Sequence, residues 1–483
     1  MKKRMPHRRS AYLSLIVTLL LLVALPFLYI GIQTTHEFLS RATGTKASII
    51  VDTTNLLEPI QPAWNSFAQG GEEQKNMLKP VSSKIAELAP RYIRIDHIYD
   101  HHRVVRRTTS GTLEFDFKAV DDIVASIIST GAKPFFALSY MPQAIAQSDI
   151  LSVPRDWNEW ALAVQRTIER YSGKDGLNLS DVYYEVWNEP DLFGKWKYDG
   201  VKNYLTLYEY AVKGAQNAQN VNEFKIGGPA TTQLYKNWIV AFADYVTQNK
   251  LRLDFISWHR YTTNPTQFAK DASEVTGWLF SYPELVALPR IISEWGFDSD
   301  INPGYDTNLA AAHSVAVIRQ AINGYTALFA FEVVDGPDPG NRKYWGRWGL
   351  LTHPASGVTP KPRFQAFKLL RLLTGQRLHL EGEGTWVTGL AAKDEQTIRV
   401  LLTNYDYAGR NNETVPVIFT RLQPGNYELK RTYLGKETTS ETIALSGDTL
   451  PVSATLPPNN VVLLELTLIT STPTSTPNPF LGN

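Results

Sequence analysis

Residues Val182–Asp191, which read Val-Tyr-Tyr-Glu-Val-Trp-Asn-Glu-Pro-Asp, decide the fold class of this chain. The run begins with apolar, aromatic and β-branched residues, a composition typical of a buried strand. It ends on a carboxylic acid followed by a proline, which cannot donate a hydrogen bond to a neighbouring strand. We therefore expect Glu189 to lie where a strand ends and a loop begins.

A second run of the same design lies further along the chain. Arg290–Phe297 reads Arg-Ile-Ile-Ser-Glu-Trp-Gly-Phe and places Glu294 at another strand end. In a barrel of alternating strands and helices, the chemistry is carried at the carboxyl-terminal ends of the strands. Two carboxylates held in this way are what a retaining glycosidase requires.

Strand-like and helix-like runs alternate between these two motifs and on both sides of them. The helical signal is clearest at Lys118–Thr130, at Arg155–Tyr171 with Pro154 in its first turn, and at Leu309–Asn323, which ends at Gly324. The eight strand candidates are Gln61–Phe67, Tyr92–Ile98, Lys133–Tyr140, Val182–Glu189, Lys225–Pro229, Phe255–Tyr261, Arg290–Glu294 and Ala327–Val334. Eight such units predict a (β/α)8 TIM barrel. A doubly wound sheet is the alternative, but no early strand is followed by a Gly-x-Gly-x-x-Gly turn.

The pattern of the sequence changes after Thr374. Short alternating runs broken by Gly, Pro and Asn predict a small antiparallel β-sandwich, and they lie at Thr397–Asn404, Val415–Leu422, Tyr427–Leu434 and Asn460–Ile469. Ala47–Thr53 alternates in the same way and is a candidate for one more strand. We therefore expect a barrel over residues 47–375, of which 47–58 are candidates for pairing with the sandwich, then a sandwich over 376–470. A Ser/Thr/Pro-rich disordered tail is expected over 471–483.

The amino-terminal region predicts export. Residues 1–10 form a basic flank, and the 22 residues of Ala11–Ile32 carry no charge. A helix of that length measures about 33 Å, enough to span a bilayer. The basic flank should stay in the cytoplasm, which places the catalytic part outside the cell membrane after a linker over 33–46. A cleaved signal peptide and a secreted protein are the alternative, but Gln33 and the residues after it offer no small-x-small cleavage site.

Composition excludes several classes of function. The chain has 48 Lys and Arg against 47 Asp and Glu, a net charge of +1, so nothing indicates a nucleic-acid partner. It has no cysteine, which excludes disulfides, thiolate metal sites and a cysteine nucleophile. Its 12 Trp, 23 Tyr and 20 Phe suit stacking on sugar rings, and they suit a large core equally well.

Side-chain alternation along the strands predicts which residues face the inside of the barrel. Ser257, His259 and Tyr261 share one face of their strand, and Arg94 and Asp96 share one face of theirs. Buried charges need partners, so we expect Arg94 to pair with Glu185 or Glu294. The structural alternative is that His259 and Tyr261 are core residues whose polar atoms are hydrogen-bonded within the protein. A structural role has at least equal weight for four residues at or near strand ends, Asp96, His97, Glu332 and Asp335.

Two other chemistries fit the sequence poorly. The histidines His97, His101 and His102 suggest a metal site, but we see no acid near them at ligand spacing and predict no metal. A serine hydrolase is disfavoured because no Gly-x-Ser-x-Gly elbow occurs.

With these motifs, the chain resembles a clan A glycoside hydrolase. Trp187-Asn188-Glu189-Pro190 is similar to the strand-four motif of that clan, and Ser293-Glu294-Trp295 to its strand-seven motif. Within the clan it most resembles glycoside hydrolase family 39, the β-xylosidase and α-L-iduronidase family. The further stretches that carry this resemblance are Ala137–Pro142, Trp258–Tyr261, Trp348–Leu351 and Lys361–Leu370.

The resemblance implies a role for each motif residue. Glu189 would be the general acid/base and Glu294 the nucleophile, and Asn188 would hydrogen-bond the sugar 2-hydroxyl. His259 and Tyr261 would orient Glu294 or bind sugar. Trp345 or Trp348, on the loop after strand eight, are candidates for a stacking wall. Arg94, expected inside the barrel from its strand face, is a further candidate substrate contact. No cofactor or metal is needed.

The predicted function is therefore retaining hydrolysis of O-glycosidic bonds in oligo- or polysaccharides, β-xylosidase-like, by a membrane-anchored enzyme. The alternatives are an endo-acting clan A glycanase and a non-catalytic carbohydrate-binding protein of the cell surface. The presence of both Glu189 and Glu294 argues against the binding protein. The sugar, the anomeric linkage and the oligomeric state are left open.

Overall fold

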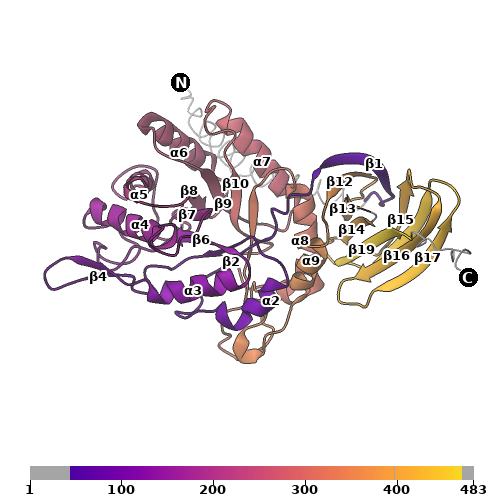
Figure 1. The fold of residues 1–483 in the computed structure, drawn as a ribbon, viewed down its shortest axis with the longest axis horizontal. Coiled ribbons are helices and arrows are strands. Elements are labelled where there is room, and N and C mark those ends of the chain that lie inside the picture. Colours follow the sequence, from indigo (N-terminus) through magenta and orange to yellow (C-terminus); the bar gives the residue numbers. More distant parts are fainter. Residues whose placement is uncertain (1–43, 396, 470–483) are drawn as a thin grey trace, which may run out of the picture.

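Eight parallel strands close into a barrel in the computed structural model, which describes residues 44–395 and 397–469 (Figure 1). The barrel strands are β2 (Ser66–Gln69), β3 (Tyr92–Ile95), β6 (Lys133–Leu138), β7 (Val182–Val186), β8 (Phe224–Thr231), β9 (Phe255–Tyr261), β10 (Arg290–Gly296) and β11 (Ala327–Phe331). Each of the eight predicted strands overlaps one of them. The expected (β/α)8 barrel is therefore confirmed, with β7 as the fourth strand and β10 as the seventh.

A helix follows every barrel strand, as the alternation predicted. The helices are α2 (Ser82–Ala86), α3 (Lys118–Ser129), α4 (Trp157–Tyr171), α5 (Tyr204–Asn217), α6 (Lys236–Asn249), α7 (Thr266–Leu279), α8 (Asn308–Ala321) and α9 (Pro362–Leu370). Short 3-10 helices lie at η1 (Lys79–Val81), η2 (Pro303–Asp306) and η3 (Pro354–Ser356). A hairpin of β4 (Val105–Arg107) and β5 (Leu113–Phe115) projects from the barrel between β3 and α3 (Figure 1).

Most predicted boundaries differ from those of the structure by one to five residues, and two of these differences have identifiable causes. The first barrel strand begins at Ser66 and not at Gln61, because a turn around Pro62 precedes it, closed by the Asn65 N–H donating to the Pro62 carbonyl at 3.0 Å. Helix α4 begins after Asp156, whose side chain accepts a hydrogen bond from the backbone N–H of Asn158. Pro154 therefore lies before the helix and not in its first turn.

Large aromatic side chains fill the interior of the barrel and leave polar residues above them. Tyr92 and Tyr183 meet edge to face with ring centroids 5.2 Å apart, and Phe135 stacks on Tyr183 at 5.4 Å. The buried members of this interior cluster are Ala68, Tyr92, Phe135, Tyr183, Phe255, Ile291, Ala327, Phe329 and Phe331. Because side chains alternate along each strand, Arg94 and Glu185 lie two residues beyond these aromatics, towards the carboxyl-terminal mouth.

The second unit is a nine-stranded sheet in the order β17-β16-β19-β14-β13-β12-β1-β15-β18. Its strands are β1 (Ile49–Pro59), β12 (Gln376–Glu381), β13 (Val387–Asp394), β14 (Thr397–Asn404), β15 (Glu413–Thr420), β16 (Gly425–Tyr433), β17 (Thr439–Leu445), β18 (Leu450–Leu456) and β19 (Asn460–Leu468). All pairs are antiparallel except β1 with β15, which are parallel.

The predicted two-sheet sandwich is one continuous sheet because β1 joins its two halves. β1 pairs with β12 on one side and with β15 on the other, as Figure 1 shows for the indigo strand beside the yellow ones. The sheet then curls over itself, since Asn404 of β14 donates to the Leu456 carbonyl of β18 at 3.0 Å although several strands separate them in the sheet. The pairing expected for Ala47–Thr53 with the C-terminal strands is present.

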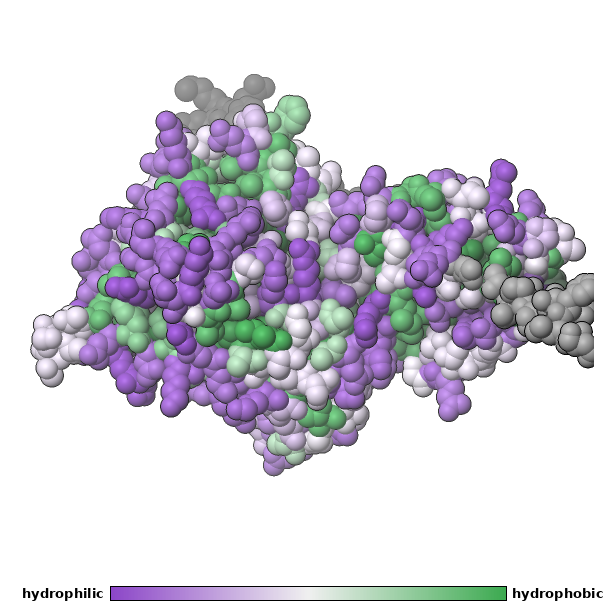
Figure 2. All heavy atoms as spheres, viewed as in Figure 1, coloured by the Kyte–Doolittle hydropathy of each residue, from purple (hydrophilic) through white to green (hydrophobic). Residues whose placement is uncertain are grey.

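Several predictions concern residues that the structure does not describe. The charged flank 1–10, the apolar segment Ala11–Ile32 and the tail 471–483 all lie outside the described residues. Within residues 44–395 and 397–469, no helix has the length and apolar character needed to cross a membrane. The face of the molecule in Figure 2 is mostly polar, with apolar side chains confined to small patches.

Candidate active site

A cavity of about 530 Å³ opens at the carboxyl-terminal ends of the barrel strands. Its walls come from the loops after β2, β3, β6, β7, β8, β10 and β11 together with residues of β9, β10 and β11, so most barrel strands contribute. The lining residues are Gly70, Gly71, Glu72, Asp96, His97, Tyr140, Asn188, Glu189, Leu192, Phe193, Thr232, Gln233, Tyr261, Glu294, Ser299, Asp300, Phe331 and Trp348. This is the end of a TIM barrel at which chemistry is expected.

Glu189 reaches the cavity through an unusual backbone path. Strand β7 ends at Val186, and both Trp187 and Glu189 have left-handed backbones with φ of 75° and 45°. Non-glycine residues adopt this region rarely and at some energetic cost. The path is held in place because the Glu189 N–H donates to the Ala230 carbonyl at 3.0 Å and the Trp187 indole N–H donates to the Phe193 carbonyl at 3.0 Å.

Glu294 faces the cavity because strand β10 contains a bulge. Ile291 belongs to the interior cluster, so strict alternation would turn Glu294 away from the barrel interior. The pairing of β10 with β9 shifts register between Ile292 and Glu294, which leaves Ser293 as an extra residue and sets Glu294 opposite His259. Bulges that redirect a side chain are common beside active sites.

Arg94 connects the buried polar groups beneath the cavity. Its Nε donates to Glu185 at 2.8 Å, its Nη1 to Glu294 at 2.8 Å and its Nη2 to Asn188 Oδ1 at 2.7 Å. The sequence left open whether Arg94 pairs with Glu185 or Glu294, and the structure shows both pairs. The Asn188 amide in turn donates to the Tyr140 hydroxyl at 3.0 Å, so its orientation is fixed from two sides.

The two candidate catalytic carboxylates lie on either side of one histidine. His259 Nδ1 is 2.9 Å from Oε1 of Glu189 and 3.5 Å from Oε2 of Glu294. One carboxylate oxygen of each glutamate and one ring nitrogen of His259 all lie within 4.8 Å of one another. Carboxyl groups of retaining glycosidases stand about 5–5.5 Å apart, and those of inverting enzymes about 6.5–9.5 Å apart. An approach of the nearest carboxylate oxygens to within 4.8 Å agrees better with the short separation of retaining enzymes than with the longer one of inverting enzymes.

Burial and neighbouring charges perturb the groups at this centre. Burial raises the pKa of Glu294, and the carboxylates of Glu189 and Asp96 add to that shift, while His259 and Arg94 oppose it. Burial alone would lower the pKa of His259, but the nearby Glu294 and Glu189 carboxylates outweigh it and raise that pKa. Tyr261 donates a hydrogen bond to Oε2 of Glu294 at 3.0 Å. Shifts of this kind are typical of functional sites.

The predicted substrate-binding residues take different positions. Asn188, Tyr261 and Trp348 line the cavity, whereas Arg94 and His259 lie behind it and contact residues that do. Trp345 is not among the lining residues. One face of the Trp348 ring is covered by the Arg347 guanidinium at 3.7 Å, which also forms an ion pair with Glu72.

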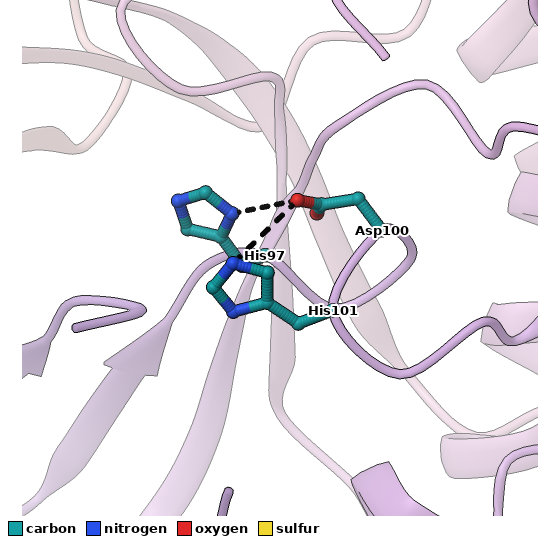
Figure 3. A group of neighbouring side chains, drawn as sticks. All are labelled: His97, Asp100 and His101. Carbon is teal, nitrogen blue, oxygen red and sulfur yellow. Dashed lines mark hydrogen bonds and ion pairs between the residues drawn. The ribbon is translucent and has the colours of Figure 1, made fainter. Parts of the chain in front are cut away.

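A histidine and acid cluster beside the cavity corrects one premise of the sequence analysis (Figure 3). Asp100 lies 2.8 Å from His97 Nδ1 and 3.8 Å from His101 Nε2, so an acid is present at ligand spacing. The two imidazole rings stack with centroids 4.1 Å apart. These three residue types could hold a metal ion, but both Asp100 oxygens already accept hydrogen bonds, one from His97 and one from the Tyr140 N–H at 3.1 Å.

Comparisons with known proteins agree with this geometry. The sequence pattern described as "Glycosyl hydrolases family 39" matches residues 47–426. The chain belongs to glycosyl hydrolase family 39. It is therefore a glycosidase of a retaining family, and a carbohydrate substrate follows from that membership.

Relatives within family 39 are similar at modest identity. A beta-xylosidase of Caldicellulosiruptor saccharolyticus is 28% identical over 348 residues, which cover 66% of this chain and 70% of that protein. A beta-xylosidase of Geobacillus stearothermophilus is 26% identical over 300 residues, 56% of this chain and 58% of that protein. The crystal structure of a monomeric beta-xylosidase from Caulobacter crescentus CB15 shares the fold, with a TM-score of 0.75 at 20% identity over 88% of this chain and 100% of that one.

Sequence reasoning left Asp96 and His97 undecided between a functional and a structural role, and it did not single out Leu192 and Phe193. Asp96 and His97 follow the end of β3, and Leu192 and Phe193 belong to the loop after Glu189. Position directly after a barrel strand was the available signal for Asp96 and His97. No pattern in the sequence distinguished Leu192 and Phe193 from ordinary loop residues, although both are exposed apolar side chains.

Proposed function

We propose that the protein is an exo-acting retaining glycosidase of β-xylosidase-like specificity, with Glu189 as general acid/base and Glu294 as nucleophile. The observation that carries the proposal is the pair of carboxylates that both approach His259 Nδ1. One oxygen of each carboxylate and a ring nitrogen of His259 lie within 4.8 Å of one another at the cavity wall. That spacing suits attack by one carboxylate while the other transfers a proton.

The division of roles rests on the contacts of each carboxylate. Glu294 accepts hydrogen bonds on both oxygens, from Arg94 at 2.8 Å and Tyr261 at 3.0 Å, and such contacts favour the charged form that a nucleophile needs. Glu189 has one close side-chain partner among the described residues, His259 at 2.9 Å, and its side chain is 13% exposed against 8% for Glu294. Its second oxygen is therefore available to carry a proton to a leaving group.

The reaction then follows two displacements. Glu189 gives its proton to the glycosidic oxygen as a Glu294 oxygen attacks the anomeric carbon, so the bond to the leaving group breaks and a glycosyl ester forms. Glu189 next takes a proton from water, whose oxygen attacks the same carbon and releases Glu294. Two inversions give net retention. Asn188, fixed by Arg94 and Tyr140, is placed to hydrogen-bond the sugar beside the bond that breaks.

The cavity has a distinct side for the leaving group. Leu192 and Phe193 lie three and four residues after Glu189, and both of their N–H groups donate to the Glu189 carbonyl, at 3.0 and 2.7 Å. Their side chains are 54% and 38% exposed although both are apolar. Since the general acid faces the leaving group, we assign this apolar rim to the aglycone. A cavity of about 530 Å³ has room for a short substrate, and for that reason we favour exo action over cleavage within a long polysaccharide.

The substrate proposal is tested with aryl glycosides. The panel comprises the β-xyloside, β-glucoside, β-galactoside, α-arabinoside and α-iduronide, with Glu294→Gln beside the wild type and Glu381→Gln, an exposed site, as control. We expect turnover of the β-xyloside, lost by several orders of magnitude in Glu294→Gln and kept in the control. Turnover that survives Glu294→Gln would refute the assignment of the nucleophile.

The endo-acting alternative is separated by its products. Release of single sugars from the end of a xylo-oligosaccharide supports exo action, whereas early appearance of mid-length fragments would identify an endo-glycanase. We further propose that the catalytic part lies outside the cell membrane, anchored by Ala11–Ile32. The sequence of that segment supports this, and loss of the enzyme from whole cells on external protease treatment would test it.

A further inference from the structure

We propose that Asp96 binds hydroxyl groups of the glycone and restricts the site to neutral sugars. This inference rests on the proposed function and deepens it, because it names the chemical class of the sugar bound beside Glu294. It assigns a substrate contact to a residue that the catalytic scheme does not use.

Asp96 presents an unsatisfied acceptor at the cavity. It is the first residue after β3, and it lines the cavity together with Glu294 and Asn188. Its Oδ1 is buried, and among the described residues it has no hydrogen-bond donor. Leaving a carboxylate without donors is costly, and because the Asp96 side chain as a whole is half-buried and lines the cavity, a ligand there can supply a donor to its accessible part.

The nearby cations give their hydrogen bonds to other groups, although the Asp96 charge contributes to raising the pKa of Arg94. Each nitrogen of the Arg94 guanidinium already donates to another acceptor, namely Glu185, Glu294 or Asn188. The adjacent His97 uses its Nδ1 for Asp100 at 2.8 Å. Asp96 is nevertheless close enough to act on the reaction centre, because its charge contributes to raising the pKa of Glu294 and that of His97.

The charge of the cavity selects the class of ligand. Its lining carries the carboxylates Glu72, Asp96, Glu189, Glu294 and Asp300, and Glu72 is paired with Arg347. The single cationic side chain among the lining residues is His97, whose pKa is raised to about 9. A uronic acid would place another carboxylate among these groups and be repelled. A neutral sugar has hydroxyl groups, which donate strong hydrogen bonds to a carboxylate.

Monodeoxy substrates test this contact directly. Wild type, Asp96→Asn, and Glu381→Gln as an exposed control outside the cavity are assayed with an aryl glycoside, its monodeoxy analogues and the matching uronide. A site built to bind a hydroxyl rejects the analogue without it strongly, so we expect kcat/KM of the wild type to fall at least about 100-fold for one deoxy position.

The expected result for Asp96→Asn is a loss of discrimination. Its kcat/KM for the parent glycoside should fall, its rate on that one deoxy analogue should change little, and its relative rate on the uronide should rise. Glu381→Gln should keep the wild-type pattern. If Asp96→Asn slows every substrate by the same factor or keeps the wild-type discrimination, the proposal is overturned. Asp96→Ser serves as a second variant if the first one misfolds.

Binding distinguishes failure of this proposal from failure of the proposed function. If the wild type hydrolyses no glycoside, the function is wrong, but calorimetric titration with the monosaccharide and its deoxy analogues still tests Asp96. Weaker binding of the parent sugar to Asp96→Asn, with unchanged binding of one deoxy sugar, supports the contact. Equal binding of all sugars to both proteins refutes it.

Discussion

Replacing Arg94 with methionine removes the one guanidinium that three buried groups share. The Arg94 side chain is 1% exposed and the Glu185 side chain is fully buried, so water cannot replace the lost contacts. Methionine is of similar length and fills the space without a charge. The variant leaves Glu185 and Glu294 as buried carboxyls that lack their cation.

We expect Arg94→Met to lower the free energy of unfolding by a large amount. Breaking a buried ion pair by removing one partner costs about 3–5 kcal/mol. Two carboxylates lose their partner here, and Oε1 of Glu185 has no other donor among the described residues, so we place Arg94→Met at the upper end of that range. The matched control is Arg166→Met at an exposed ion pair with Glu169, for which we expect about 1 kcal/mol or less.

The pH dependence of this cost gives a sharper test. Burial raises the pKa of Glu294 above its usual value of 4.5, and Arg94 opposes that rise, so the pKa rises further in Arg94→Met. A carboxyl with a raised pKa in the folded state destabilises the fold as pH rises through that pKa. The difference in stability between Arg94→Met and wild type should therefore be larger at pH 8 than at pH 5.

The assay is urea unfolding at both pH values, followed by tryptophan fluorescence, with Glu185→Gln as a second perturbation. In the wild type Glu185→Gln weakens the pair with Arg94 and should destabilise the protein. In Arg94→Met it removes an uncompensated charge and should stabilise it, so the sign of its effect reverses. A cost for Arg94→Met near that of Arg166→Met, or a cost that does not change with pH, would refute this account of Arg94.

Three further predictions concern catalysis. Glu189→Ala should lower kcat/KM about 10²–10⁴-fold for glycosides with poor leaving groups and far less for dinitrophenyl glycosides. Azide should restore turnover, and equal losses on both kinds of substrate would exclude Glu189 as the general acid. His259→Gln removes a positive charge that lowers the pKa of Glu294, so the acid limb of the kcat/KM profile should move to higher pH, and an unmoved limb would count against the contact. Phe193→Ala should raise KM for an aryl glycoside but not for the methyl glycoside of the same sugar, whereas an equal rise would place Phe193 away from the leaving group.

Regular features of the fold could be predicted from the sequence because they depend on local patterns. Runs such as Phe255–Tyr261 end where the structure ends them, since apolar alternation and flanking polar residues mark a strand from within. The expectation that Arg94 needs an acidic partner followed from the cost of a buried charge. Assigning Glu189 to the segment after the fourth strand and Glu294 to the seventh strand required only counting.

Other features depend on contacts that no local pattern records. Alternation would have turned Glu294 outward, and only the bulge at Ser293 brings it opposite His259. The left-handed backbone at Trp187 and Glu189 is held by Ala230 and Phe193, which lie outside the motif itself.

Exposure of side chains was equally hard to foresee. Trp345 and Trp348 were indistinguishable in the sequence, yet Trp348 lines the cavity and Trp345 does not. Asp100 escaped notice as a partner of His97 because the turn that brings them together has no strong sequence signal. In each case the fold around the residue, and not its neighbours in sequence, decides what it contacts.

The central claim is that Glu294 attacks the sugar. It is tested most directly by incubating the purified protein with the 2-deoxy-2-fluoro derivative of the glycosyl fluoride that it turns over, which slows breakdown of the covalent intermediate. Peptide mass spectrometry then locates the label. This account predicts one sugar per chain on Glu294, with no labelling of Glu294→Gln. A label on Glu189 or on any other residue would contradict it.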